Sequence, residues 1–218
     1  MKIRWTANNF GRSGILAISE IGDTQPPVDT FYLDYIVENT DQDRIAVAAA
    51  LIFGAYANDR LLFESPISSE VSRSIELFLA ERSLRVDPVS FVDNNSIHGD
   101  AIIVLDHSAV HAPPQNQLGM QRRIRLSLLP TQFSSGGLLT MNSLSVAANA
   151  WLHARLNEGI GEDVSSVAAA VLLSADLSAA GLALCKEAHV LSDSVNPDSL
   201  RALLESTGLS LVMGDHCN

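Results

Sequence analysis

The chain has 218 residues, of which 47% are hydrophobic and only 18% are charged, and its formal net charge at pH 7 is −11. A chain of this length buries enough surface to fold without a disulfide or metal staple. The negative charge argues against binding nucleic acid by general charge attraction, because that binding requires clustered Lys and Arg.

The first 37 residues are expected to form strands. Residues 15–18 are a short apolar run, and residues 30–37 alternate aromatic with polar side chains, which is typical of a strand. Lys2 and Arg4 are followed by polar residues, so no secretory signal peptide is expected and the chain is predicted to be cytoplasmic.

Helices and strands are predicted to alternate in the next segment. The predicted elements are a helix over 42–57, a strand over 60–64, a helix over 69–81 and a strand over 85–92. Thr40 or Asp41 is the expected N-cap of the first helix and Ser68 that of the second. The apolar run 101–105 predicts a strand buried on both faces.

The second half of the chain repeats this alternation after a break. Residues 109–122 contain Pro113-Pro114 and predict a linker. Beyond it, the predicted elements are a strand over 124–129, helices over 142–157 and 163–179, a strand over 182–185, a helix over 197–206 that begins after Asn196, and a strand over 209–213. The Ala-rich run 164–185 contains Asp176, which favours a buried helix and strand over a membrane span.

These elements together predict the fold class. Alternating helices and strands with short connections indicate an α/β protein built around a mixed, partly parallel sheet. The predicted organisation is an acidic α/β lobe over 1–108, a linker over 109–122 and a second α/β lobe over 123–218. The two lobes either share one sheet or form two.

The sharpest candidate for a ligand site is Ser134-Ser135-Gly136-Gly137, between a predicted strand and a predicted helix. Glycines there allow backbone N–H groups to bind a phosphate, and a following helix would add partial positive charge. The segment resembles the SGG start of the PP-loop of ATP pyrophosphatases, which implies a degenerate nucleotide site. That loop continues with one variable residue, an aspartate and a serine, whereas Gly137 is followed here by Leu138, Leu139 and Thr140. An ordinary Ser/Gly turn is the alternative.

A second candidate is a metal site. His98, Asp106, His107 and His111 lie within fourteen positions, and imidazole and carboxylate groups together can hold Zn²⁺ or another divalent ion. Solvated loop residues are the alternative, because Pro113-Pro114 follows directly. Asp215-His216-Cys217 offers three ligand types in a row, but chain ends are commonly disordered.

Arg122, Arg123 and Arg125 form the one basic cluster, which suits a phosphate, an acidic partner or the acidic half of the chain itself. Cys185 and Cys217 cannot form a disulfide framework and favour a reducing compartment.

No complete catalytic signature occurs in the sequence. The low charge and the apolar surplus therefore predict a non-catalytic protein-interaction subunit of a bacterial cytoplasmic assembly, whose partner is another protein or a second copy. The bacterial source is suggested by arginine, since Lys2 and Lys186 are the two lysines among 14 basic residues. Two alternatives remain open: a nucleotide-binding enzyme or sensor with a phosphate at Ser134–Gly137, and a metal-dependent hydrolase using Asp106, His107 and His111. The sequence names no cofactor.

Overall fold

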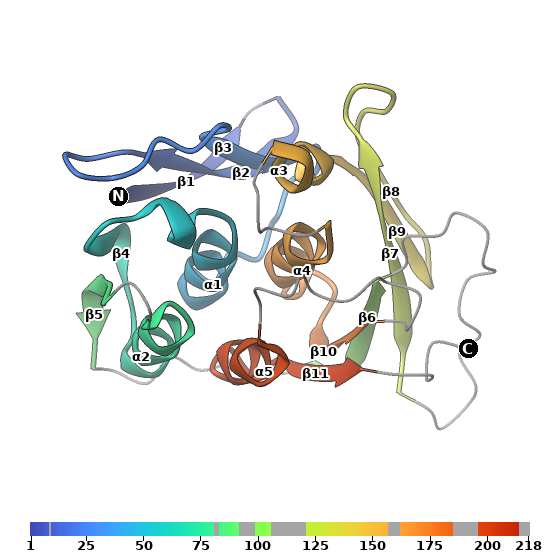
Figure 1. The fold of residues 1–218 in the computed structure, drawn as a ribbon. Coiled ribbons are helices and arrows are strands. Elements are labelled where there is room, and N and C mark those ends of the chain that lie inside the picture. Colours follow the sequence, from blue (N-terminus) through green and yellow to red (C-terminus); the bar gives the residue numbers. More distant parts are fainter. Residues whose placement is uncertain are drawn as a thin grey trace.

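The computed structural model describes residues 1–8, 10–80, 83–91, 99–105, 121–156, 162–184 and 196–213. Within these residues, five α-helices accompany one sheet of 11 strands (Figure 1). The sheet is mixed and partly parallel, and helices alternate with strands along the chain. The predicted α/β class is therefore confirmed.

The elements have the following bounds. The helices are α1 (Gln42–Phe53), α2 (Ser69–Phe78), α3 (Ala150–Leu156), α4 (Glu162–Leu173) and α5 (Pro197–Glu205), with a short 3-10 helix η1 (Gly54–Tyr56) after α1. The strands are β1 (Lys2–Asn8), β2 (Arg12–Ile18), β3 (Thr30–Leu33), β4 (Arg60–Ser68), β5 (Arg85–Ser90), β6 (Ala101–Leu105), β7 (Arg123–Pro130), β8 (Gly137–Leu139), β9 (Ser143–Ala148), β10 (Ala179–Leu184) and β11 (Ser210–Met213).

The two halves of the sheet have the same strand order. The N-terminal half runs β3-β2-β1-β4-β5 and the C-terminal half runs β9-β7-β6-β10-β11, so each half has its first strand in the middle. The halves meet where β3 pairs antiparallel with β9, at Leu33 and Ala148. They differ in direction, because β2 is antiparallel to both neighbours whereas β7 is parallel to both. Strands from both predicted lobes thus belong to one sheet.

The core lies between the helices and one face of the sheet. Figure 1 shows the helices gathered in the middle of the molecule with the strands arranged around them. Alternate strand residues such as Ile3, Ile15 and Ile103 point to this side and are buried. Helix α1 packs against α4, and nearly all its residues are buried because it lies between that helix and the sheet. Small side chains, mainly alanine, let two helix axes approach closely.

Local capping signals in the sequence are confirmed. The side chain of Asp41 caps α1 by accepting from the amide of Asp43, and Ser68 caps α2 by accepting from the amide of Val71. Asn196 caps α5, which begins at Pro197 as predicted. Each cap satisfies a backbone N–H that the first turn of a helix leaves without a partner.

The helix predicted over 142–157 is wrong in its first half. Residues 143–148 form strand β9, and the helix α3 begins only at Ala150. The short strand β8, which pairs antiparallel with β9, was not predicted at all. Leu144 and Val146 are buried while Ser143 and Ser145 are half-buried, which is the two-residue alternation of a strand. The Ala-rich composition and a capping asparagine concealed that period.

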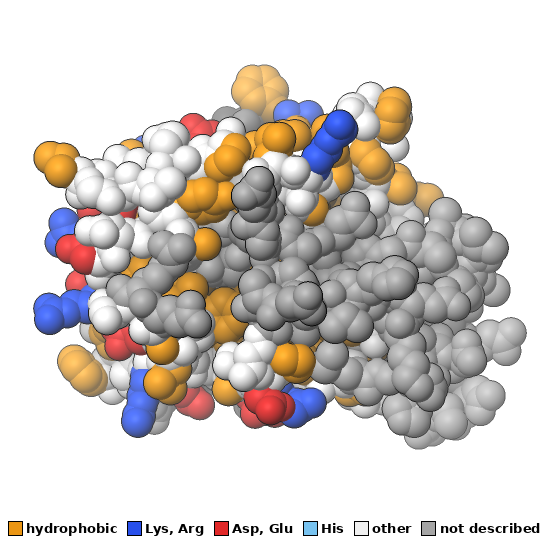
Figure 2. Space-filling model, viewed as in Figure 1, with side chains coloured by type: hydrophobic (Ala, Val, Ile, Leu, Met, Phe, Trp, Pro, Cys, Tyr) orange, Lys and Arg blue, Asp and Glu red, His pale blue; other side chains and the backbone are white. Residues whose placement is uncertain are grey.

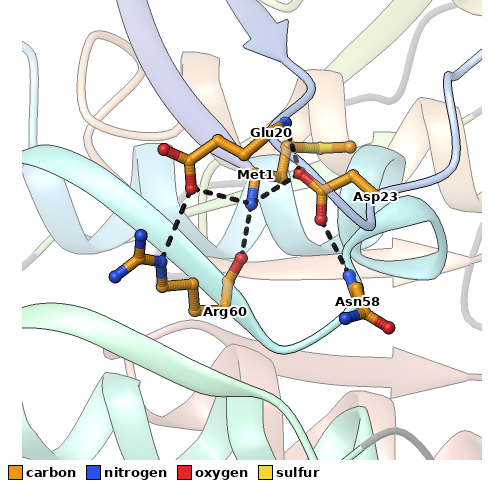
Figure 3. Close-up of polar contacts among 5 residues, drawn as sticks. All are labelled: Met1, Glu20, Asp23, Asn58 and Arg60. Carbon is orange, nitrogen blue, oxygen red and sulfur yellow. Dashed lines mark hydrogen bonds and ion pairs between the residues drawn. The ribbon is translucent and has the colours of Figure 1, made fainter.

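A polar cluster holds the amino group of Met1 inside the fold (Figure 3). The group donates to the carbonyl of Arg60 at 2.7 Å and lies 2.8 Å from Oδ2 of Asp23, with Oε2 of Glu20 at 3.8 Å. Asp23 also accepts from the amides of Glu20 and Asn58, at 2.7 and 2.9 Å. One carboxylate therefore ties β1, the segment after β2 and the start of β4 together.

No helix in the described part of the chain is long and apolar enough to cross a membrane.

Candidate functional site

The Ser134–Gly137 segment lies in the connection between β7 and β8. Gly136 has a φ of +74°, which a residue with a side chain rarely adopts, and Gly137 is the first residue of β8. A strand follows the glycines instead of the predicted helix. The partial positive charge of a helix N-terminus is therefore missing from this segment.

A carboxylate of the chain itself binds the central glycine. The amide of Gly136 donates to Oδ2 of Asp34 at 2.7 Å, and the other oxygen of Asp34 accepts from Nε of Arg12 at 2.8 Å. The hydrogen bond from Gly136, followed by that from Arg12, lowers the pKa of Asp34 below its ordinary value. The guanidinium of Arg12 lies over the ring of Tyr32, 4.9 Å from its centroid.

These contacts bear on the phosphate prediction. A phosphate at Ser134–Gly137 would compete with the carboxylate of Asp34 for the N–H of Gly136, and the nearby cation Arg12 already has an anionic partner. The positive φ of Gly136 is compatible both with phosphate binding and with the observed contact to Asp34. Phosphate binding at Ser134, Ser135, Gly136 and Gly137 stays a prediction.

The metal-site residues His98, Asp106, His107 and His111 lie outside the described residues, as do residues 109–120 of the predicted linker and residues 215–217. Within the ranges that the structure describes, no group of three or more His, Cys, Asp or Glu side chains is arranged to hold a metal ion. The metal prediction therefore stays a prediction.

The basic cluster lies at the start of β7. Arg122 is exposed and donates to the carbonyl of Met141 at 3.3 Å. Arg123 and Arg125 alternate with the buried Ile124 and Leu126, so they lie on the sheet face that points away from the helices. Arg123 and Arg125 also interact with other residues, so neither is a free cation.

His153, which the sequence did not single out, is completely buried in α3. Its ring lies edge-on to Phe31 and Phe53, and its Nε2 atom is 3.0 Å from the carbonyl oxygen of Thr30. Because a carbonyl can only accept, Nε2 carries a proton. Burial lowers the pKa of His153 below its ordinary value, and the hydrogen bond to Thr30 offsets only part of that effect.

We expect His153 to make the protein less stable in mild acid. The unfolded chain takes up a proton at this imidazole near pH 6.5, and the folded chain does so only at lower pH. The free energy of unfolding should therefore fall as the pH drops from about 7 to about 5. Urea denaturation at several pH values should show a smaller decrease for His153→Phe than for the wild type. His107→Phe removes an imidazole elsewhere, and an equal effect of that change would contradict the assignment to His153.

A group of exposed apolar side chains lies next to the Gly136 segment. Four large apolar side chains within nine residues are strongly exposed: Phe133 (82%), Leu138 (67%), Leu139 (51%) and Met141 (82%). We call these four residues the β8 surface. In Figure 2, hydrophobic side chains stand at the surface in the region where Figure 1 shows the connection between β7 and β8. One feature of the sequence indicates the β8 surface: large apolar residues occur in a segment that has neither helical nor strand periodicity.

No family model matches the chain, and neither the curated proteins nor the solved structures contain a significant match to it.

Proposed function

We propose that the chain is a non-catalytic protein-interaction subunit and that the β8 surface is where it contacts its partner. The observation that carries the proposal is the exposure of Phe133, Leu138, Leu139 and Met141 on one short segment. Leu138 and Leu139 are adjacent in a strand and point to its opposite sides, so a partner would have to enclose β8 to cover all four apolar side chains. The composition further suggests that the assembly is bacterial and cytoplasmic.

The backbone of β8 supports the same role. The carbonyl of Gly136 accepts from Ala147, and the amide of Thr140 donates to Ser143, so these residues face β9. The alternate residues Gly137 and Leu139 then direct their backbone groups away from β9. No strand among those described pairs with that edge of β8. An exposed edge strand can pair with a strand of another chain.

We expect the purified protein to associate with itself through the β8 surface when no other partner is present. Sedimentation velocity between about 1 and 100 μM should show an average mass that rises with concentration. Leu138→Asp should weaken association at least about tenfold, because the carboxylate would lose its hydration in the interface.

Leu77→Asp is the matched control for this experiment. Leu77 lies on α2, is 65% exposed and undergoes the same substitution, so it should leave the association unchanged. A wild-type protein that remains monomeric over the whole range would contradict self-association, and equal weakening by Leu77→Asp would remove the β8 surface as its location.

A further inference from the structure

A cavity of about 150 Å³ lies between β1, β4 and the first residue of α1. Its apolar wall consists of Ile3, Ile45 and Phe63, which are all buried. Trp5 and Gln42, which are half-buried, also line the cavity, and Glu64 and Ser65 of β4 complete its lining.

The cavity exists because β1 and β4 separate. The two parallel strands pair only at Lys2 with Leu62 and at Ile3 with Phe63. Farther along, the pairing of β4 with β5 shifts register between Leu62 and Ile67, and this stretch contains Pro66, which has no N–H to donate. The space therefore opens on the carboxyl side of the paired residues.

The cavity lies where the order of the strands changes direction. From β1 the chain passes to the antiparallel strand β2 on one side, whereas α1 leads to β4 on the other side. The lining residues belong to the middle of β1 and β4, so the cavity lies beside these strands and not beyond their carboxyl ends.

The lining restricts the chemistry of a ligand. A cavity of about 150 Å³ has room for a single six-membered ring, and its lining offers an apolar wall together with polar side chains. The side chains of Trp5, Gln42 and Ser65 have no hydrogen-bond partner among the described residues, so they are able to bind one polar group. The lining contains the carboxylate of Glu64 and no cation, and the neighbouring Arg4 is already paired with Glu64 at 2.8 Å, which disfavours an anion.

We propose that this cavity binds a small neutral compound with one aromatic ring and one hydrogen-bonding group, of the size of phenol. The proposal is independent of the β8 surface, which lies on other strands.

Phenol itself is the probe for the first experiment. The chain has two tryptophans, so Trp151→Phe leaves the indole N–H of Trp5 as a single nitrogen-15 NMR signal. Titration with phenol should shift this signal in a saturable manner, with a dissociation constant on the order of 1 mM or tighter. Benzoate should bind at least about tenfold more weakly, because its charge would meet the carboxylate of Glu64.

Two variants locate the binding. In the same background, Gln42→Phe fills the rim of the cavity and should weaken phenol binding at least about tenfold, whereas Gln25→Phe, in an exposed loop, should not change it. Ser65→Leu is the substitute if Gln42→Phe does not fold. A signal that shifts without saturation, or unchanged phenol affinity in the folded cavity variant, would overturn the proposal.

Discussion

Replacing Asp23 with asparagine is expected to destabilise the protein by about 3 kcal/mol at pH 7, because a buried ammonium group would lose its nearer anionic partner and keep only the half-exposed Glu20. The side chain of Asp23 is only 2% exposed, and its Oδ2 atom lies 2.8 Å from the amino group of Met1. An asparagine would also turn an N–H₂ group toward donors that now meet a carboxylate oxygen. Urea denaturation monitored by circular dichroism measures the loss.

The pH dependence gives a second measurement of the same contact. Burial raises the pKa of Asp23, but hydrogen bonds from the Met1 amino group and from the amides of Glu20 and Asn58 outweigh it, and the pKa is lowered overall. Asp23 therefore stabilises the fold above the pKa of the unfolded carboxyl, 3.8, and this stabilisation disappears as the pH falls through the lower folded value. Asp23→Asn should unfold with less dependence on pH in that acidic range.

Two controls separate the ion pair from a general surface effect. Glu20 is 37% exposed and 3.8 Å from the same amino group, so Glu20→Gln should cost less than about 1 kcal/mol. Acetylation of the Met1 amino group should destabilise the wild-type protein more than it destabilises the Asp23→Asn variant, because the variant retains only the longer ion pair with Glu20. Equal losses in both proteins would contradict the assigned pairing.

Asn149→Ala is expected to destabilise the protein by about 1–3 kcal/mol, because the amide of Tyr32 would lose its partner and the carbonyl of Thr30 would keep only the ring of His153. Oδ1 of Asn149 accepts from the amide of Tyr32 at 2.8 Å, and Nδ2 donates to the carbonyl of Thr30 at 2.6 Å. The side chain is 3% exposed and continues the pairing between β3 and β9, which have one paired position. Asn149 is therefore a joint between the two halves of the sheet.

Hydrogen exchange locates this effect within the molecule. The amide of Tyr32 should exchange faster in Asn149→Ala, whereas Ile15, in the ladder between β2 and β3, should change only as much as global stability does. Asn58→Ala is the matched control, because Asn58 is exposed and its replacement should change stability by less than about 0.5 kcal/mol. A Tyr32 amide that exchanges as in the wild type would show that Asn149 does not protect it.

The elements that the sequence predicted correctly have local causes. Asp41, Ser68 and Asn196 accept hydrogen bonds from residues two or three positions away, so their capping is visible in a short stretch of sequence. The helices that follow carry their apolar residues at helical spacing, and the α/β alternation follows from the order of these elements. In these helices, the local helical preference of the sequence and the packing in the folded protein favour the same structure.

The elements that were mispredicted depend on distant neighbours. Residues 143–148 form a strand because β7 and β8 pair with them on either side, although the stretch also contains alanines and a potential cap. The amide of Gly136 meets Asp34, which is 102 positions away, so the sequence showed a glycine turn without its partner. The exposure of the β8 surface likewise follows from the position of β8 at the side of β9.

The sequence by itself determined helices α1, α2 and α5 with their caps, and the α/β class, because those depend on contacts within a few residues. The single sheet, the joint at Asn149, the buried amino group at Asp23 and the cavity between β1 and β4 were decided only by the tertiary structure. Each of them joins residues far apart in the chain, and their proximity results from the packing of the whole sheet against the helices. A sequence pattern of short period carries no record of such pairs.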